Sequence, residues 1–222
     1  MIKASPRMDR LAFLFSAIVI GAAAFWIVQH GLFSPVLAQS DNWTWYIIRA
    51  SGLLAYILLT VSTLWGLALS SRLFKNWSPG PLSMVLHSTL SWMAVSFGAL
   101  HALLLVADKY VPYTITDVLI PFAGPYRPLA VGLGTLAFWI ILVVTLSFSF
   151  KKRLGHRVWK WIHLTSYLAF VLVTVHGLTA GTDASRLGVR LMLMASVTVV
   201  TLLLAVRVAR RGPTRGTAAV SV

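Results

Sequence analysis

The sequence predicts an all-α integral membrane protein, built as a bundle of six transmembrane helices. Of the 222 residues, 58% are hydrophobic and only 11% are charged, whereas about a quarter of the residues in a soluble domain carry charge. Mean hydropathy is +0.83. Six apolar windows are long enough to cross a hydrocarbon core of about 30 Å. Two of these windows also carry a pair of histidines, which makes them the candidate functional helices.

The six windows take up most of the chain and are expected to form one transmembrane domain, residues 11–209. We expect a short cytoplasmic N-terminus over residues 1–10 and a short basic cytoplasmic tail over residues 210–222. The apolar run of the first window is too long for a typical signal peptide, so we expect a retained helix there. The windows cover residues 11–28, 45–69, 82–107, 129–150, 158–180 and 187–209.

The distribution of basic residues predicts which side of the membrane each connection faces, because Lys and Arg are enriched in cytoplasmic connections. With both termini in the cytoplasm, fourteen of the nineteen basic residues lie on the inner side and four of the five acidic residues on the outer side. The net charge of +14 is therefore read as topology and contact with membrane lipids, without nucleic acid as a partner. We expect a multi-pass protein of the cell membrane, in the bacterial cytoplasmic membrane. The inner cations are Lys3, Arg7, Arg10, Arg72, Lys75, Lys151, Lys152, Arg153, Arg157, Lys160, Arg207, Arg210, Arg211 and Arg215.

The paired histidines are predicted to lie at matching depths in two parallel helices. His87 and His101 are fourteen residues apart in the third window, and His163 and His176 are thirteen residues apart in the fifth. At 1.5 Å per residue, the two histidines of each helix are separated by roughly 20 Å along its axis. Both helices run from the inner to the outer side, so His87 matches His163 near the inner face. His101 correspondingly matches His176 near the outer face.

Histidines inside a membrane are functional candidates because an ionisable group is costly to place there. The alternative, a structural hydrogen bond between helices, suits one isolated histidine better than four at matched depths. Only small residues, Ser91, Ala94 and Gly98, stand on the face between His87 and His101, which leaves room for a flat cofactor or for close helix packing. On a straight helix, thirteen residues place the two histidines of the fifth window about 140° apart around the helix axis. Either this helix is bent, or the two cofactors approach it from different flanks.

Two separated histidine pairs favour haem over other metal chemistry. Zinc prefers four clustered nitrogen or sulfur ligands, and a proton relay would need carboxylates, which the windows lack. Two axial imidazoles suit a six-coordinate iron that transfers electrons without binding substrate. Cysteine is absent, which excludes disulfides, thiolate-held iron–sulfur clusters and covalent attachment through CxxCH, so any haem would be of the b type.

The region over residues 43–209 resembles the ferric-reductase-like transmembrane domain, a superfamily that includes NADPH oxidases, yeast-type ferric reductases and the haem subunit of the periplasmic methionine-sulfoxide reductase. The resemblance rests on the two histidine spacings and on the segment KWIHLTSYLAFVLVTVH. It implies two haem b groups, an inner one held by His87 and His163 and an outer one held by His101 and His176. Members of the methionine-sulfoxide branch often lack a histidine at the place of His87, so its presence favours the two-haem pattern.

The resemblance further implies electron transfer across the membrane, from a cytoplasmic-side donor to an outer-side acceptor. These 222 residues hold no flavin or nicotinamide domain, so we expect an electron-transfer subunit of a membrane oxidoreductase. A cytoplasmic flavoprotein reductase or quinol would supply the electrons, with flavin or quinone as a candidate inner-side cofactor. An outer-side redox protein or small molecule would accept them. Arg49 and Arg127 are candidate contacts of the outer haem propionates, with anchoring at the membrane interface as an equal alternative.

A second class of function is a structural or assembly subunit of a larger membrane redox complex, with one haem or none. Such a subunit would depend for its stability on the other chains of that complex. A small transporter is the least favoured function, because the windows lack intramembrane carboxylates and broken helices.

Overall fold

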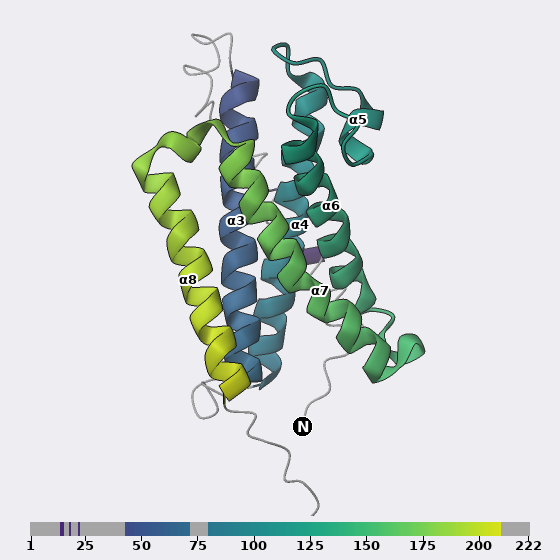
Figure 1. The fold of residues 1–222 in the computed structure, drawn as a ribbon. Coiled ribbons are helices and arrows are strands. Elements are labelled where there is room, and N and C mark those ends of the chain that lie inside the picture. The colour runs from purple at the N-terminus through teal and green to yellow at the C-terminus, as the bar shows by residue number, and fades with distance from the viewer. Residues whose placement is uncertain (1–13, 16–17, 19–21, 23–42, 72–79, 210–222) are drawn as a thin grey trace, which may run out of the picture.

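The computed structural model describes residues 14–15, 18, 22, 43–71 and 80–209, and these ranges form an all-helical bundle (Figure 1). Five of its helices are long and apolar enough to cross a membrane. A five-residue helix and a short 3-10 helix complete the described part. In chain order the elements are α3 (Trp43–Ser70), α4 (Gly80–Ala107), α5 (Ile115–Leu119), α6 (Pro128–Ser147), α7 (Lys151–Thr179), η1 (Thr182–Ser185) and α8 (Leu187–Ala209).

The five long helices coincide closely with the second to sixth predicted windows. Of the first predicted span, residues 11–28, only four residues lie within the described part of the chain. One expectation was wrong: residues 151–157, which the predicted windows leave as the connection between the fourth and fifth spans, belong to α7, which begins at Lys151. The backbone of Gly155 has φ 76° and ψ 157°, values that a side chain disfavours, and this residue kinks the helix. The basic segment therefore forms a separate helical piece before the apolar part of α7.

The helices pack mainly as two antiparallel pairs, α3 with α4 and α6 with α7. Helix α8 lies against α3, and α7 crosses between α8 and α6 in the view of Figure 1. A buried cluster joins Tyr56 and Leu59 of α3, Phe170 of α7, and Leu193 and Val200 of α8. Many large apolar side chains of the long helices point away from the bundle and are exposed, as expected of helices that contact lipid.

The connection between α4 and α6 forms a small structured cap that contains α5. Helix α5 begins with a capping box, in which the Thr114 hydroxyl accepts from the Asp117 backbone N–H and the Asp117 carboxylate accepts from Thr114. Hydrogen bonds from Thr114 hold the pKa of Asp117 below its ordinary value. The indole N–H of Trp139, well inside α6, donates to the Leu119 carbonyl at 2.9 Å. The cap therefore folds back along the side of α6.

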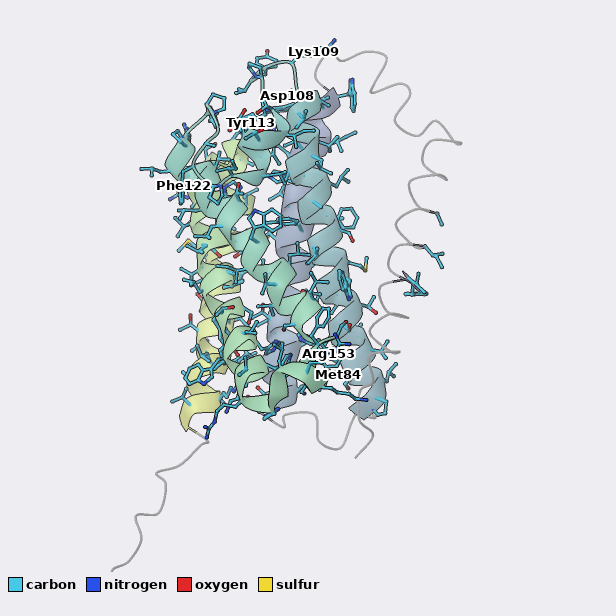
Figure 2. All side chains as sticks on the ribbon, turned by 90° about the vertical axis from the view of Figure 1, so that its right-hand side faces the viewer. Met84, Asp108, Lys109, Tyr113, Phe122 and Arg153 are labelled. Carbon is cyan, nitrogen blue, oxygen red and sulfur yellow. The ribbon has the colours of Figure 1, made fainter. Side chains whose placement is uncertain are left out.

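The two ends of the bundle differ in charge. Asp108, Lys109, Tyr113 and Phe122 lie at the end that holds α5 and η1, and Arg153 lies at the opposite end (Figure 2). We name the α5 end outer and the opposite end inner, after the predicted sidedness. Among the described residues all acidic side chains belong to the outer end, and most basic ones belong to the first half of α7 and the end of α8 at the inner end.

Candidate functional site

The four predicted histidines meet as two pairs between α4 and α7. The ring centres of His87 and His163 are 6.1 Å apart, with their planes at 76°. The ring centres of His101 and His176 are 6.2 Å apart, with their planes at 75°. Each pair joins one helix to the other at a single depth, which is the pairing predicted from the spacing. The two pairs also have nearly the same geometry.

Three of the four rings are oriented by a backbone carbonyl of a neighbouring helix. The Nδ1 atoms of His87, His101 and His176 lie 3.1, 2.8 and 2.9 Å from carbonyl oxygens. A carbonyl can only accept, so Nδ1 carries the proton and Nε2 keeps its lone pair in these neutral rings. A donated Nδ1–H is the usual second contact of a histidine that ligates a metal through Nε2. The three carbonyls belong to Ser62, Ile48 and Ala130 respectively.

A glycine follows each of these carbonyls by four residues and lies beneath the same ring. A Cβ atom on Gly52 would come within 2.8 Å of His101 Nδ1, and one on Gly134 within 2.7 Å of His176 Nδ1. A Cβ on Gly66 would lie 3.1 Å from His87 Cε1. Because the residue one turn after each carbonyl is a glycine, no side chain covers that carbonyl, and the histidine ring can lie against the helix. Each carbonyl and glycine therefore form a shallow seat for one imidazole.

His163 is held in a different way. The ring of Trp159, one turn earlier in α7, stacks on it at 5.2 Å with the planes at 19°. Lys151 Nζ lies 3.7 Å from the centre of that indole, in a cation–π contact on α7 itself. The indole N–H of Trp159 is buried and has no hydrogen-bond partner among the described residues. One turn beyond His163, the Tyr167 hydroxyl accepts a 2.7 Å hydrogen bond from Arg207 of α8.

Helix α7 is continuous between its two histidines, since its only non-helical backbone is at Gly155, before His163. On a regular helix the two rings leave α7 about 140° apart. Their partners on α4 are only about 40° apart by the same count. The two pairs therefore form on different flanks of α7, which answers the question that the spacing had left open.

The outer pair opens into a largely apolar cavity between α3, α4, α6 and α7. His101 and His176 line it together with five glycines, Gly52, Gly98, Gly134, Gly177 and Gly181. The predicted small face of α4 contributes Ala94 and Gly98 to the wall. Small residues and apolar walls leave space beside the rings for a flat, mostly apolar group.

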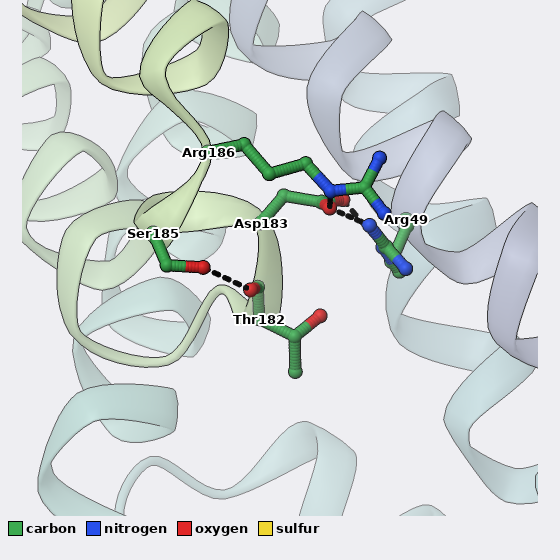
Figure 3. A network of polar contacts seen from close by, with 5 residues as sticks. All are labelled: Arg49, Thr182, Asp183, Ser185 and Arg186. Carbon is green, nitrogen blue, oxygen red and sulfur yellow. Dashed lines mark hydrogen bonds and ion pairs between the residues drawn. The ribbon is translucent and has the colours of Figure 1, made fainter.

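An ion-pair network closes the outer end of this cavity. Asp183 of η1 accepts from the Arg49 guanidinium of α3, and Arg186 Nε lies 2.9 Å from the same carboxylate (Figure 3). The Arg49 guanidinium also lies over the Trp45 ring, 3.8 Å from its centre. Side-chain exposure is 17% for Arg49 and 12% for Asp183, against 70% for Arg186. The Arg49–Asp183 pair thus fixes η1 to α3 over the cavity.

The two predicted arginines lie at different places. Arg49 lines the cavity of the outer pair, although its guanidinium is already engaged by Asp183. Arg127 lines a neighbouring pocket, and its Nη1 donates to the Thr179 carbonyl at the end of α7 at 2.6 Å. Both therefore lie next to the outer pair, but only Arg49 lines its cavity.

Asp183→Asn is expected to lower the free energy of unfolding by about 2 kcal/mol, because it leaves the largely buried Arg49 side chain without its anionic partner. The measurement is the unfolding temperature of the detergent-purified protein. Arg186→Gln is the matched control, since it removes the exposed arm of the same network and should cost well under 1 kcal/mol. Equal losses of stability in both variants would mean that the Arg49–Asp183 ion pair stabilises the protein no more than the exposed Arg186 contact does.

The residues present fit a bis-histidine metal cofactor. Two imidazoles, one from α4 and one from α7, come together at each depth, and within the described ranges no group of three or more His, Cys, Asp or Glu side chains is placed to hold a metal ion. The donors available at each depth are therefore two imidazole nitrogens, in place of a four-ligand cluster of the zinc kind. The seats that orient three of these rings were not predicted from the sequence.

Comparison with known proteins identifies a family for this chain. The ferric reductase like transmembrane component family matches residues 51–174, a range that contains three of the four histidines and both inner-pair members. No curated protein and no solved structure matched the chain. The matched range covers more than half of the sequence, and it includes the outer-pair residue His101 and most of α7. The chain belongs to the ferric reductase like transmembrane component family.

Proposed function

We propose that this protein is a b-type di-haem membrane protein that moves electrons across the membrane. In this proposal an inner-side donor reduces the inner site, the electron passes to the outer site, and an outer-side acceptor takes it. His87 and His163 hold the inner haem, and His101 and His176 hold the outer one. Membership of the ferric-reductase-like family supports the transmembrane electron-transfer role.

The spacing of the ring centres is the observation that carries the proposal. An imidazole nitrogen lies about 1.1 Å from its ring centre and metal–nitrogen bonds are about 2 Å long, so one axially ligated metal separates two ring centres by about 6 Å. The observed separations are 6.1 and 6.2 Å. The match recurs at both depths, with nearly the same interplanar angle in each pair, and this repetition supports the proposal.

The chain's own residues orient the ligands and exclude water. The three backbone seats fix Nδ1 as the protonated nitrogen, so that Nε2 is the ligating atom. Between the two depths, the rings of Tyr56 and Phe170 stack at 5.9 Å, and both are almost fully buried. This layer places packed, buried aromatic side chains between the two sites. A bound haem b supplies reversible one-electron chemistry at iron.

The inner end offers a positively charged surface to a donor. Lys151 and Arg207 lie near the inner pair, and the exposed cations Lys152, Arg153 and Arg157 surround them. Such a surface favours an acidic protein or a phosphate-bearing flavin. A cytoplasmic flavoprotein reductase or quinol is therefore the donor class that we propose.

A vesicle assay tests this function. Proteoliposomes loaded with ferricyanide receive dithionite outside, with valinomycin and potassium to dissipate the membrane potential. Neither reagent crosses the bilayer, so bleaching of the internal ferricyanide reports electrons that pass through the protein. We expect rapid bleaching with the native protein and a fall to the rate of protein-free vesicles with His101→Ala. Native-like bleaching by that variant would exclude the two-site path.

A further inference from the structure

The outer end holds a second pocket, of about 460 Å³, that is distinct from the cavity of the histidines. It lies among the loop before α6, the end of α7, η1 and the first turn of α8. Tyr126, Arg127, Leu178, Ser185 and Arg190 line it. None of the described residues that line it is acidic, so among them two arginines give the pocket a positive charge that no carboxylate offsets.

Arg127 is held in place at this pocket. Its backbone lies in the left-handed region, with φ 41° and ψ 60°, a conformation that costs energy for a residue other than glycine. Its Nη1 donates to the Thr179 carbonyl, and the guanidinium lies 5.3 Å from the centre of the Tyr126 ring. One arm of the guanidinium is thus used to dock on α7, while Arg127 still lines the pocket.

The nearest acidic residue does not neutralise the pocket. Asp183 is engaged by Arg49 and Arg186, and it lines the histidine cavity on the other side of η1. Arg190 stands one helical turn beyond Arg186, is exposed, and lines the pocket itself. The second pocket therefore keeps two guanidinium groups for a ligand from outside.

The pocket and the cavity of the outer histidine pair share a wall. Gly181, Thr182 and Ala184 line both of them. Only this short segment, at the start of η1, separates a ligand in the pocket from the space beside His101 and His176. A solute bound there would lie at the outer end of the electron path.

We propose that this pocket is the acceptor site and that its ligand is a small polyanionic one-electron oxidant. The proposal rests on the proposed electron-transfer function. The bound oxidant gains one electron from the transmembrane path, so its charge becomes more negative by one, and no bond is made or broken. Arg127 and Arg190 attract the oxidised anion through charge-assisted hydrogen bonds.

Hexacyanocobaltate(III) is the probe, because it has the charge and shape of ferricyanide but does not accept the electron. Its binding is measured by titration calorimetry on the purified protein in nanodiscs of zwitterionic lipid. We expect saturable binding of one anion per chain. Arg190→Gln should weaken it by about ten-fold, the effect of losing one charge-assisted hydrogen bond.

Lys109→Gln is the matched control, since Lys109 is an exposed cation at the same end of the bundle and does not line the pocket. The affinity of this variant for hexacyanocobaltate should stay within about two-fold of the native value, because the charge removed is distant and screened. Equal weakening in both variants, or no saturable binding, would overturn the site.

The same arginines would also recognise a lipid phosphate. A second titration distinguishes a soluble anion from a lipid headgroup as the ligand. Titration is repeated in nanodiscs that contain phosphatidylglycerol. Binding that persists supports a soluble acceptor, whereas binding abolished only in the anionic discs would assign the pocket to a lipid headgroup and overturn the proposal. This probe reads binding without haem chemistry, so its outcome is independent of whether the electron-transfer function holds.

Discussion

His101→Ala is expected to remove one of two haems and leave the other in place. The variant takes away one ligand of the outer pair, and the inner pair does not depend on it, because His87 and His163 have their own contacts on α3 and α7. His87→Ala should give the complementary result, with loss of the inner haem alone. The measurement is haem b per chain by pyridine haemochrome, with ferric spectra to identify which site remains.

His156→Ala is the control for this pair of variants. His156 is exposed in the basic start of α7 and belongs to neither histidine pair. It should keep the full haem content of the native protein. If His87→Ala kept the same haem content as His156→Ala, the protein would hold its haem at the outer pair alone.

Gly134→Ala is expected to weaken haem at the outer site without removing either ligand. An added Cβ would come within 2.7 Å of His176 Nδ1 and 2.9 Å of its Cγ, so the ring must leave the seat that the Ala130 carbonyl provides. Loss of such an orienting contact typically costs about 10–100-fold in metal affinity. The variant should therefore lose outer haem during purification and bind added hemin about 10–100-fold more weakly at that site.

Gly188→Ala provides the steric control. Gly188 lies at the start of α8, does not line the cavity, and a Cβ there would meet nothing within 4 Å among the described residues. Haem content should match that of the native protein. The seat would have no role if Gly134→Ala and Gly188→Ala retained haem equally.

The sequence alone predicted much of this fold, because lipid imposes strong constraints. Long apolar runs must be helical in a bilayer, so five predicted windows and the described helices agree within a few residues, apart from the start of α7. The basic segment at that start was taken for a loop because positive charge marks cytoplasmic connections. Charge says nothing about backbone conformation, and the segment is helical up to the kink at Gly155.

Histidine pairing was also predictable, since nearly equal spacings of fourteen and thirteen residues on parallel helices place the histidines at matching depths. The seats beneath the rings were not predicted, although a signal for two of them exists. Gly52 and Gly66 are fourteen residues apart on α3, the same spacing as His87 and His101 on the antiparallel α4. Many glycines in transmembrane helices serve helix packing, so this coincidence becomes informative only when the helix pairing is known.

The ion pair over the outer cavity could not be predicted from the chain. Arg49 and Asp183 are 134 residues apart and meet only because α3 and η1 come together in the bundle. The second outer pocket likewise combines the loop before α6 with residues from the end of α7, η1 and the first turn of α8. Contacts of this kind depend on tertiary packing, which local patterns do not encode.

Haem b per chain of the purified native protein tests the central claim most directly, with electron paramagnetic resonance of the ferric form on the same sample. We predict two haems per chain, both low-spin and six-coordinate, as two bis-histidine sites require. A protein that is monodisperse, unfolds cooperatively and contains no haem would contradict the claim. The histidine pairs would then be structural links between α4 and α7 in a subunit of a larger membrane complex.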